Sequence, residues 1–241
     1  PPDPAAPGDA APADRDEATE RPSPPLPSWA RRPAPHEPDP PRPMSPSRAL
    51  LDPNAAPGLL SPLEGGRGAQ KNRFKRGNLI HRLLQSLPDL APADREHRAR
   101  AFLALPGHDL APEEQAEIHA AVFKVLNDPA FAALFVPEAR AEVALAGEVR
   151  RGETPHAISA RLDRLLVTEN EVLVIDFKTN RPPPKTPAEV APAYLMQMAA
   201  YRALLAQIYP GRQIRAGLLW TDGPTLMSLE GDRLDAIWSG S

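Results

Sequence analysis

Hydrophobic runs in the second half of the chain predict β-strands. Residues 158–167 and 173–179 are rich in Leu, Ile and Val, and the polar stretch 168–171 separates them. Apolar runs of this length on both sides of a turn are typical of an antiparallel hairpin. Three further strands are expected, at residues 140–149, 214–220 and 225–229.

Hydrophobic residues with helical spacing occupy much of the remainder. Positions 79, 80, 83, 84 and 87 form one stripe, which predicts a helix over 77–87 that Pro88 ends. Five further helices are expected, at residues 94–105, 112–127, 129–135, 189–208 and 232–238. This order of helices and strands predicts an α/β (α+β) domain, with a central mixed sheet, flanking helices and an N-terminal helical segment.

The distribution of proline divides the chain. Of 33 prolines in 241 residues, 19 fall within the first 62, where large apolar residues are scarce. Such a segment buries too little surface to offset the entropy lost on ordering. We therefore expect residues 1–68 to be a linker, largely disordered or extended, and 69–241 to be one domain. Since the chain does not begin with Met, we expect the linker to join this domain to a preceding one.

Composition excludes several kinds of site. The chain has no cysteine, so disulfides, thiolate zinc sites and iron–sulfur clusters are not expected. No apolar run reaches membrane-spanning length and no signal peptide is recognisable, so we expect a cytoplasmic location and no membrane partner. Residues 69–241 hold 21 basic and 21 acidic side chains. A nucleic-acid binder acting alone would usually carry a basic excess.

One local basic run interrupts this neutrality, between residues 67 and 76. It contains Lys71, Arg73, Lys75 and Arg76. These side chains are candidates for contacts with DNA phosphates. The same run is equally compatible with a solvated segment leading into the first helix.

The predicted hairpin brings two carboxylates together. A turn centred between Glu169 and Asn170 places Asp163 opposite Asp176, with Cβ atoms about 5 Å apart. At an effective dielectric constant of about 20, the two charges repel by roughly 3 kcal/mol. Protonation or a bound cation would relieve that repulsion. Lys178 shares a strand face with Asp176, so the pattern predicts a divalent-metal site beside a positive charge. The alternative is an exposed polar face with a salt bridge.

Two helices contribute further candidates. Gln197 and Tyr201 are four residues apart and share a helix face, from which they can position a phosphate or a base. Taken alone, Tyr201 is better explained as an amphipathic residue at the edge of the core. His81 lies beside the apolar stripe of the first helix, where an isolated histidine is most often a packed or surface residue.

Five short motifs follow one another along the chain: Gly77-x-x-x-His81, Glu142, Asp163, Asp176-x-Lys178 and Gln197-x-x-x-Tyr201. This order resembles the RecB-like nuclease domain, a branch of the PD-(D/E)XK superfamily with a restriction-endonuclease-like core. The segment 176–182 (DFKTNRP) and the lead-in 26–29 (LPSW) are similar to the C-terminal nuclease domain of AddA-type helicase–nuclease subunits of the alphaproteobacterial kind. Asn180 is a departure, because many family members have Gly there.

The resemblance implies a role for each motif residue. Asp163, Asp176, His81 and the backbone carbonyl of Phe177 would bind Mg²⁺, and the imidazole would also suit Mn²⁺. Lys178 would orient the attacking water and stabilise charge on the phosphate. Gln197 and Tyr201 would support the site and the DNA backbone. Glu142 matches a glutamate common in the family.

The resemblance also implies an activity and partners. The domain would hydrolyse phosphodiester bonds as an exonuclease or endonuclease, cutting single-stranded DNA delivered by helicase domains of the same polypeptide. Its setting would be double-strand-break repair and recombination, with an AddB-type subunit as partner. One alternative is a catalytically silent module of the same fold that holds DNA or docks a subunit. An independent nuclease of the CRISPR-adaptation type is a second alternative, but those usually carry cysteines for a cluster.

Overall fold

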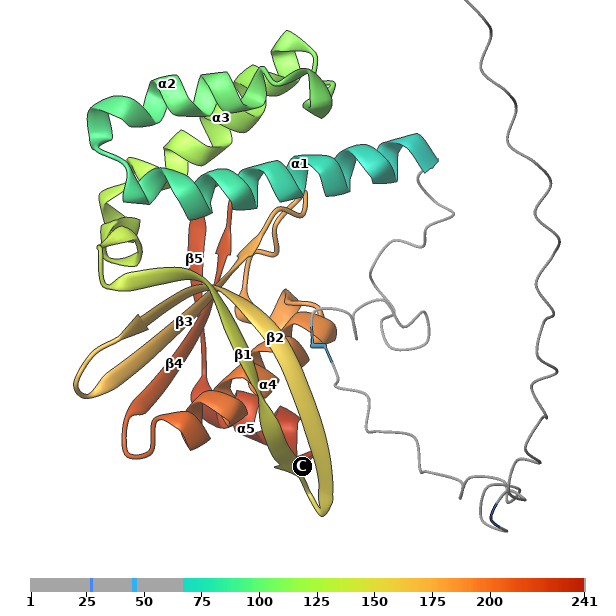
Figure 1. Cartoon of the computed structure of the whole chain (residues 1–241). Coiled ribbons are helices and arrows are strands. Elements are labelled where there is room, and N and C mark those ends of the chain that lie inside the picture. The colour runs from blue at the N-terminus through green and yellow to red at the C-terminus, as the bar shows by residue number, and fades with distance from the viewer. Residues whose placement is uncertain (1–26, 28–44, 47–66, 241) are drawn as a thin grey trace, which may run out of the picture. The chain divides into compact units, whose positions relative to one another are not determined.

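The computed structural model describes residues 27, 45–46 and 67–240 (Figure 1). The chain divides into two compact units, 1–40 and 41–241, and the second holds every helix and strand described. Most of the predicted linker, 1–68, lies outside the described residues, and its lead-in 26–29 is described only at Pro27. The linker therefore stays a prediction.

The predicted elements are all present, and the ends of most of them are shifted. The α-helices are α1 (Arg67–Ser86), α2 (Pro92–Leu103), α3 (Pro112–Leu126), α4 (Pro192–Ile208) and α5 (Gly231–Ser239). The strands are β1 (Ala139–Arg151), β2 (Thr154–Val167), β3 (Glu171–Lys178), β4 (Gln213–Trp220) and β5 (Thr225–Leu229). The short helix expected at 129–135 is a 3-10 helix, η5 (Pro129–Phe135).

The starts of α2 and α4 differ from the predicted ones for a local reason, whereas α3 begins at Pro112 as predicted. Helices α2, α3 and α4 each begin at a proline, whose fixed φ suits the first turn and whose missing N–H costs no hydrogen bond there. Helix α1 begins ten residues earlier than predicted, so the basic run forms its first turns and does not precede it. Within the described residues no single helix is long and apolar enough to span a membrane. One pair of helices bent by 87°, Pro112–Leu126 with Pro129–Phe135, has the length and composition of a span, by those two criteria only.

The strands form one mixed sheet in the order β1-β2-β3-β4-β5. Strands β3 and β4 are parallel and the other neighbours are antiparallel. The parallel pair needs a crossover, and helix α4 supplies it. The expected fold class, a mixed sheet with flanking helices and an N-terminal helical segment, is confirmed.

The β2–β3 hairpin has the predicted register. Its pairs run from Val167–Val172 to Arg164–Ile175, as a turn centred between Glu169 and Asn170 requires. Asp163 and Asp176 come immediately after the last of these pairs. The regular ladder ends there, so the two aspartates occupy the point where the strands part.

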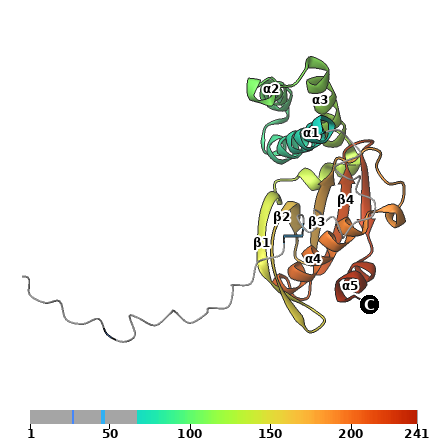
Figure 2. The same cartoon turned by 90° about the vertical axis from the view of Figure 1, so that its right-hand side faces the viewer.

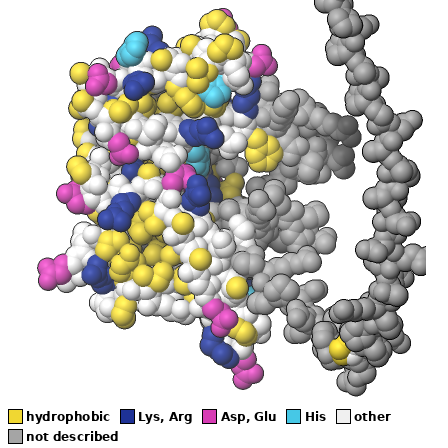
Figure 3. Space-filling view, in the orientation of Figure 1, with side chains coloured by type: hydrophobic (Ala, Val, Ile, Leu, Met, Phe, Trp, Pro, Cys, Tyr) yellow, Lys and Arg dark blue, Asp and Glu magenta, His cyan; other side chains and the backbone are white. Residues whose placement is uncertain are grey.

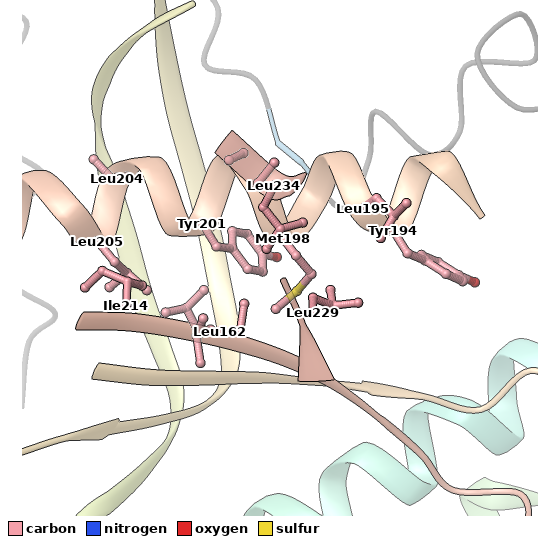
Figure 4. Close-up of a cluster of buried hydrophobic side chains, with 14 of the residues drawn as sticks. Leu162, Tyr194, Leu195, Met198, Tyr201, Leu204, Leu205, Ile214, Leu229 and Leu234 are labelled. Atoms are coloured by element: carbon pink, nitrogen blue, oxygen red, sulfur yellow. The ribbon is translucent and has the colours of Figure 1, made fainter. Parts of the chain in front are cut away.

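Two hydrophobic cores cover opposite faces of the sheet. Val172 and Val174 face helix α4 in one core, while Ile175 and Phe177 face helices α1 and α3 in the other. Figures 1 and 2 show the helical segment α1–α3 and the pair α4–α5 on different sides of the strands. In Figure 4, apolar side chains of α4, Met198 among them, lie over the strands. Alternation along β3 thus turns Asp176 and Lys178 toward α4.

A buried arginine fastens helix α1 to the sheet. Arg164 of β2 is 2% exposed. Its guanidinium donates to the carbonyl of Leu84 on α1 at 3.1 Å and to that of Ala139 on β1 at 2.9 Å. It also lies over the Phe135 ring, 5.1 Å from the centroid. Burial lowers the pKa of Arg164. The helical segment is therefore held in a fixed position next to Asp163, the residue before Arg164.

Candidate active site

The candidate site lies at the carboxyl end of β3, between α4 and α1. Asp176 and Lys178 are 5% and 7% exposed, so both charged side chains are almost fully enclosed. The Lys178 Nζ is 2.6 Å from the Asp176 Oδ2. Buried charges of this kind are retained only when they are paired and hydrogen-bonded. The pairing accounts for the Asp-x-Lys spacing on one strand face.

Gln197 of α4 joins these two residues. Its Oε1 accepts from Lys178 Nζ at 2.8 Å, and its Nε2 donates to Asp176 Oδ1 at 2.9 Å. The same Nε2 donates to the Tyr201 hydroxyl at 2.8 Å, one helical turn further on. Gln197 is 3% exposed, and an amide has both the donors and the acceptor that this position requires. Both helix residues predicted from their spacing thus join the strand pair.

Burial shifts the pKa values of Asp176 and Tyr201. It raises the pKa of Asp176, the charge of Asp163 raises it further, and Lys178 opposes the shift. Burial also raises the pKa of Tyr201, so its hydroxyl stays protonated. The charge of each of these two carboxylates therefore affects the protonation of the other.

Asp163 links the other side of the site to helix α1. Its Oδ2 accepts the backbone N–H of Phe177 at 2.7 Å, and its Oδ1 is 3.3 Å from the Nδ1 of His81. Burial acts to raise the pKa of Asp163, but His81, the Phe177 amide and Lys178 outweigh it and hold the pKa below its ordinary value. Burial lowers the pKa of His81, and Asp163 more than compensates, so that pKa is raised.

Gly77 explains how α1 comes this close. A Cβ at position 77 would lie 2.9 Å from Thr179 Oγ1, closer than two such atoms approach. A larger residue at position 77 would therefore require the Thr179 side chain to shift where the helix crosses the segment after β3. Because α1 rests against this segment, His81, one turn later, reaches Asp163. This contact gives the Gly77-x-x-x-His81 spacing a physical reason.

A charged network beside the site was not found from the sequence. Glu117 of α3 accepts from Arg76 of α1 at 2.8 and 3.0 Å, and also from Arg181. Arg181 in turn donates to Asp222 at 2.9 Å. The network joins three segments distant in sequence to the loop after β3. No periodicity within any one segment signals such a pairing.

Tyr194 was also missed. The Lys178 ammonium lies 4.0 Å from the centroid of its ring, and its hydroxyl donates to Asn180 Oδ1 at 2.9 Å. Tyr194 is 9% exposed. Its position three residues before Gln197, on the same helix face, was the available signal.

Comparison with known proteins decides the family. The model of the PD-(D/E)XK nuclease superfamily matches residues 59–230. The chain belongs to this superfamily. Among solved structures, the one titled "Crystal structure of SSO0001" is similar, with 16% identity over 70% of this chain and 83% of that chain, and a TM-score of 0.32. A likeness at this level carries no argument about function. No curated protein matches the chain.

Nucleases of the PD-(D/E)XK superfamily typically use divalent metals. Among the residues that the structure describes, no group of three or more His, Asp or Glu side chains is arranged as a ready metal cluster. The types of donor suit a divalent cation, because two carboxylates and one imidazole lie near the end of β3, although they are not grouped as a ready cluster. Both oxygens of Asp176 are engaged by Lys178 and Gln197, so those contacts would have to loosen on binding.

The remaining predicted site residue on the sheet is Glu142. Glu142 occupies the β1 position level with Asp163, between the pairs Ala141–Arg164 and Val143–Leu162. Its φ of 52° is unusual for a residue other than glycine. Its carboxylate is 3.4 Å from an Arg161 nitrogen and is thus paired with Arg161.

The basic run is only partly described. Arg76 binds Glu117, and Lys75 donates to the Asp109 carbonyl at 2.5 Å. The side chains of Lys71 and Arg73 lie outside the described part. In the space-filling view, a histidine lies beside acidic and basic side chains where the helical segment meets the sheet (Figure 3).

Proposed function

We propose that this chain is a Mg²⁺-dependent DNA nuclease domain that cuts single-stranded DNA. The observation that carries the proposal is the convergence of Asp163, Asp176 and Lys178 at the end of β3, in a chain of the PD-(D/E)XK superfamily. A silent module would have no need of two mutually repelling carboxylates in an enclosed position. Asp163, Asp176, His81 and the Phe177 carbonyl are proposed as the metal ligands.

Hydrolysis of a phosphodiester needs a nucleophile and relief of negative charge at phosphorus. A bound divalent cation supplies both, because it lowers the pKa of a coordinated water and neutralises phosphate oxygens. Lys178 supplies a fixed positive charge beside the carboxylates, which favours a phosphate in the same place. Gln197 keeps that ammonium and the Asp176 carboxylate in one orientation, while Tyr201 holds the Gln197 amide.

The proposal extends to a RecB-like domain of the AddA type. Its support is the order of the five motifs, from Gly77-x-x-x-His81 to Gln197-x-x-x-Tyr201, and the segment 176–182. In that setting a linked helicase delivers the strand during double-strand-break repair, in the cytoplasm, with an AddB-type subunit as partner. The balanced charge of residues 69–241 fits a nuclease that a motor feeds, since it needs little affinity of its own for DNA.

The test is cleavage of end-labelled single-stranded DNA by the 241-residue chain with Mg²⁺. We expect the parent to cut and Asp176→Ala to lose activity while keeping its fold by circular dichroism. Glu169→Ala is the matched control, because it removes an exposed carboxylate from the turn of the same hairpin. The control should cut like the parent, and EDTA should stop both.

Equal cutting by Asp176→Ala would refute the assigned site. Absence of cutting by every variant, with Mg²⁺ or Mn²⁺, would favour the silent DNA-holding or docking module. Supplying an AddB-type subunit and the helicase domains then tests whether the domain acts only within that assembly.

A further inference from the structure

One aromatic side chain stands out on the surface of helix α1. Among the described residues three large hydrophobic side chains are exposed: Phe74 at 58%, Leu105 at 50% and Ile208 at 45%. Phe74 is the aromatic one, and it lies within the basic run. Exposing an aromatic ring leaves apolar surface in water, so its position relative to the candidate site is informative.

Phe74 lies on the same side of α1 as His81. The two are seven residues apart, which is two turns and about 10 Å along the helix axis. The packed side of the helix carries other residues, Ile80 and Leu84 among them, both 0% exposed. The ring therefore stands on the side of α1 that carries His81, and the rise between the two residues corresponds to about three stacked nucleotides.

The surroundings of Phe74 are cationic. Arg73 and Lys75 flank it in sequence, Lys71 precedes it by nearly one turn, and the first turn of α1 has no acidic residue. Lys75 is engaged by Asp109, because its Nζ donates to the Asp109 carbonyl at 2.5 Å and lies 4.0 Å from the Asp109 Oδ2. An exposed aromatic ring on a helix segment rich in basic residues is a combination by which proteins bind single strands: the charges attract the phosphates, and the ring stacks on a base.

We propose that Phe74 is a stacking platform for an unpaired base of the DNA strand that enters the candidate site. This inference rests on the proposed function and adds a physical basis for choosing single strands. In a duplex both faces of each base are stacked on neighbours, so the ring has no face to bind unless the strand is open. The basic residues adjacent to Phe74 in the sequence supply positive charge that attracts the DNA backbone.

The test is equilibrium binding of a fluorescein-labelled single-stranded oligonucleotide to the full chain in EDTA, where no cleavage occurs. Phe74→Ala should weaken binding roughly 5- to 150-fold, the range that one stacked base contributes. Phe74→Trp should bind within about threefold of the parent, because it restores an aromatic face. Phe74→Leu should lose affinity like Phe74→Ala, since an aliphatic side chain has no such face.

Leu105→Ala is the matched control, because it removes a similarly exposed apolar side chain near the end of α2. It should bind like the parent. The dependence of affinity on salt should be the same for Phe74→Ala and the parent, because no phosphate contact is removed. Quenching of 2-aminopurine placed within the oligonucleotide should be present with the parent and absent with Phe74→Ala.

Three results would overturn the platform. They are parent-like binding by Phe74→Ala, full affinity with Phe74→Leu, and no binding of single strands by the parent even at low salt. Failure of the proposed nuclease looks different. In that case the parent binds single strands through Phe74 but cuts none with Mg²⁺ or Mn²⁺, and the platform stands without the activity.

Discussion

The ammonium group of Lys178 lies 4.0 Å from the centroid of the Tyr194 ring. Asp176 and Gln197 contact the same ammonium at 2.6 and 2.8 Å, so three different groups hold it. The ring face is electron-rich and attracts the cation, and this attraction is stronger in an enclosed site. The second ring contact of Tyr194, with Trp220, has a centroid distance of 6.1 Å. Tyr194 thus positions the lysine that the proposed chemistry requires.

Tyr194→Leu should lower kcat for single-strand cleavage about tenfold with little change in KM, because Lys178 loses its aromatic face. Tyr194→Phe keeps the ring and gives up only the hydrogen bond to Asn180, so its kcat should stay within about threefold of the parent. Tyr209→Leu is the control, since it removes a ring near Arg212 at the far end of α4. Equal losses with Leu and Phe would assign the role to the hydroxyl.

Gln197→Leu should destabilise the fold by about 1–3 kcal/mol, because buried polar groups of Asp176, Lys178 and Tyr201 lose a partner. It should also lower the cleavage rate. Urea unfolding measures the first effect, and cleavage of labelled DNA measures the second. The exposed Gln207 of the same helix provides Gln207→Ala as a control that should change neither. A stable but inactive Gln197→Leu would show that the amide serves the site alone.

Glu117 should make stability depend on acidity. Hydrogen bonds from Arg76 lower its pKa below the ordinary 4.5, and Arg181 lowers it further. A carboxylate with a lowered pKa in the folded state stabilises the fold above its unfolded pKa. That contribution disappears as the pH falls through the folded pKa. When the pH is lowered from about 5 to about 3, the free energy of unfolding should therefore fall less for Glu117→Gln than for the parent.

Urea titrations at several pH values measure this difference. Glu113→Gln is a matched control, because Glu113 is an exposed residue of the same helix, α3. It should follow the parent over the whole range. A parent-like pH profile for Glu117→Gln would mean that the pairs with Arg76 and Arg181 contribute nothing measurable in solution.

His81→Ala should weaken Mn²⁺ binding by about tenfold or more, since an imidazole is removed from the proposed ligand set. Calorimetric titration of the metal into DNA-free protein measures this without relying on activity. His97→Ala should leave affinity unchanged, because His97 is exposed on α2. Unchanged affinity in His81→Ala would instead assign His81 to packing against Phe177, whose ring is 5.8 Å away.

Much of the fold is encoded in local patterns. The polar turn at 168–171 determined the hairpin register of β2 and β3, because a turn centred between Glu169 and Asn170 specifies which residues pair. The same register placed Asp163 beside Asp176 at the end of the ladder. Helical spacing likewise put Gln197 and Tyr201 on one face of α4. Such features depend on residues close in sequence.

Helix ends were less predictable. Helix α1 begins at Arg67, ahead of the apolar stripe from Leu79 to Leu87 that packs against the rest of the domain. The residues before the stripe have a weak apolar pattern, so the sequence did not indicate that the helix extends through them. The start of α4 at Pro192 follows from proline geometry at the first turn.

Tertiary structure alone decided which distant segments meet. The approach of Gly77 to Thr179 brings His81 to Asp163, and no pattern within α1 specifies that partner. Arg76 and Arg181 share Glu117 only because α1, α3 and the loop after β3 converge. The local sequence determines which residues share a face of each element, how they are spaced and which of them are charged. The enclosed contacts that tune those groups arise from packing between elements, and packing depends on the whole chain.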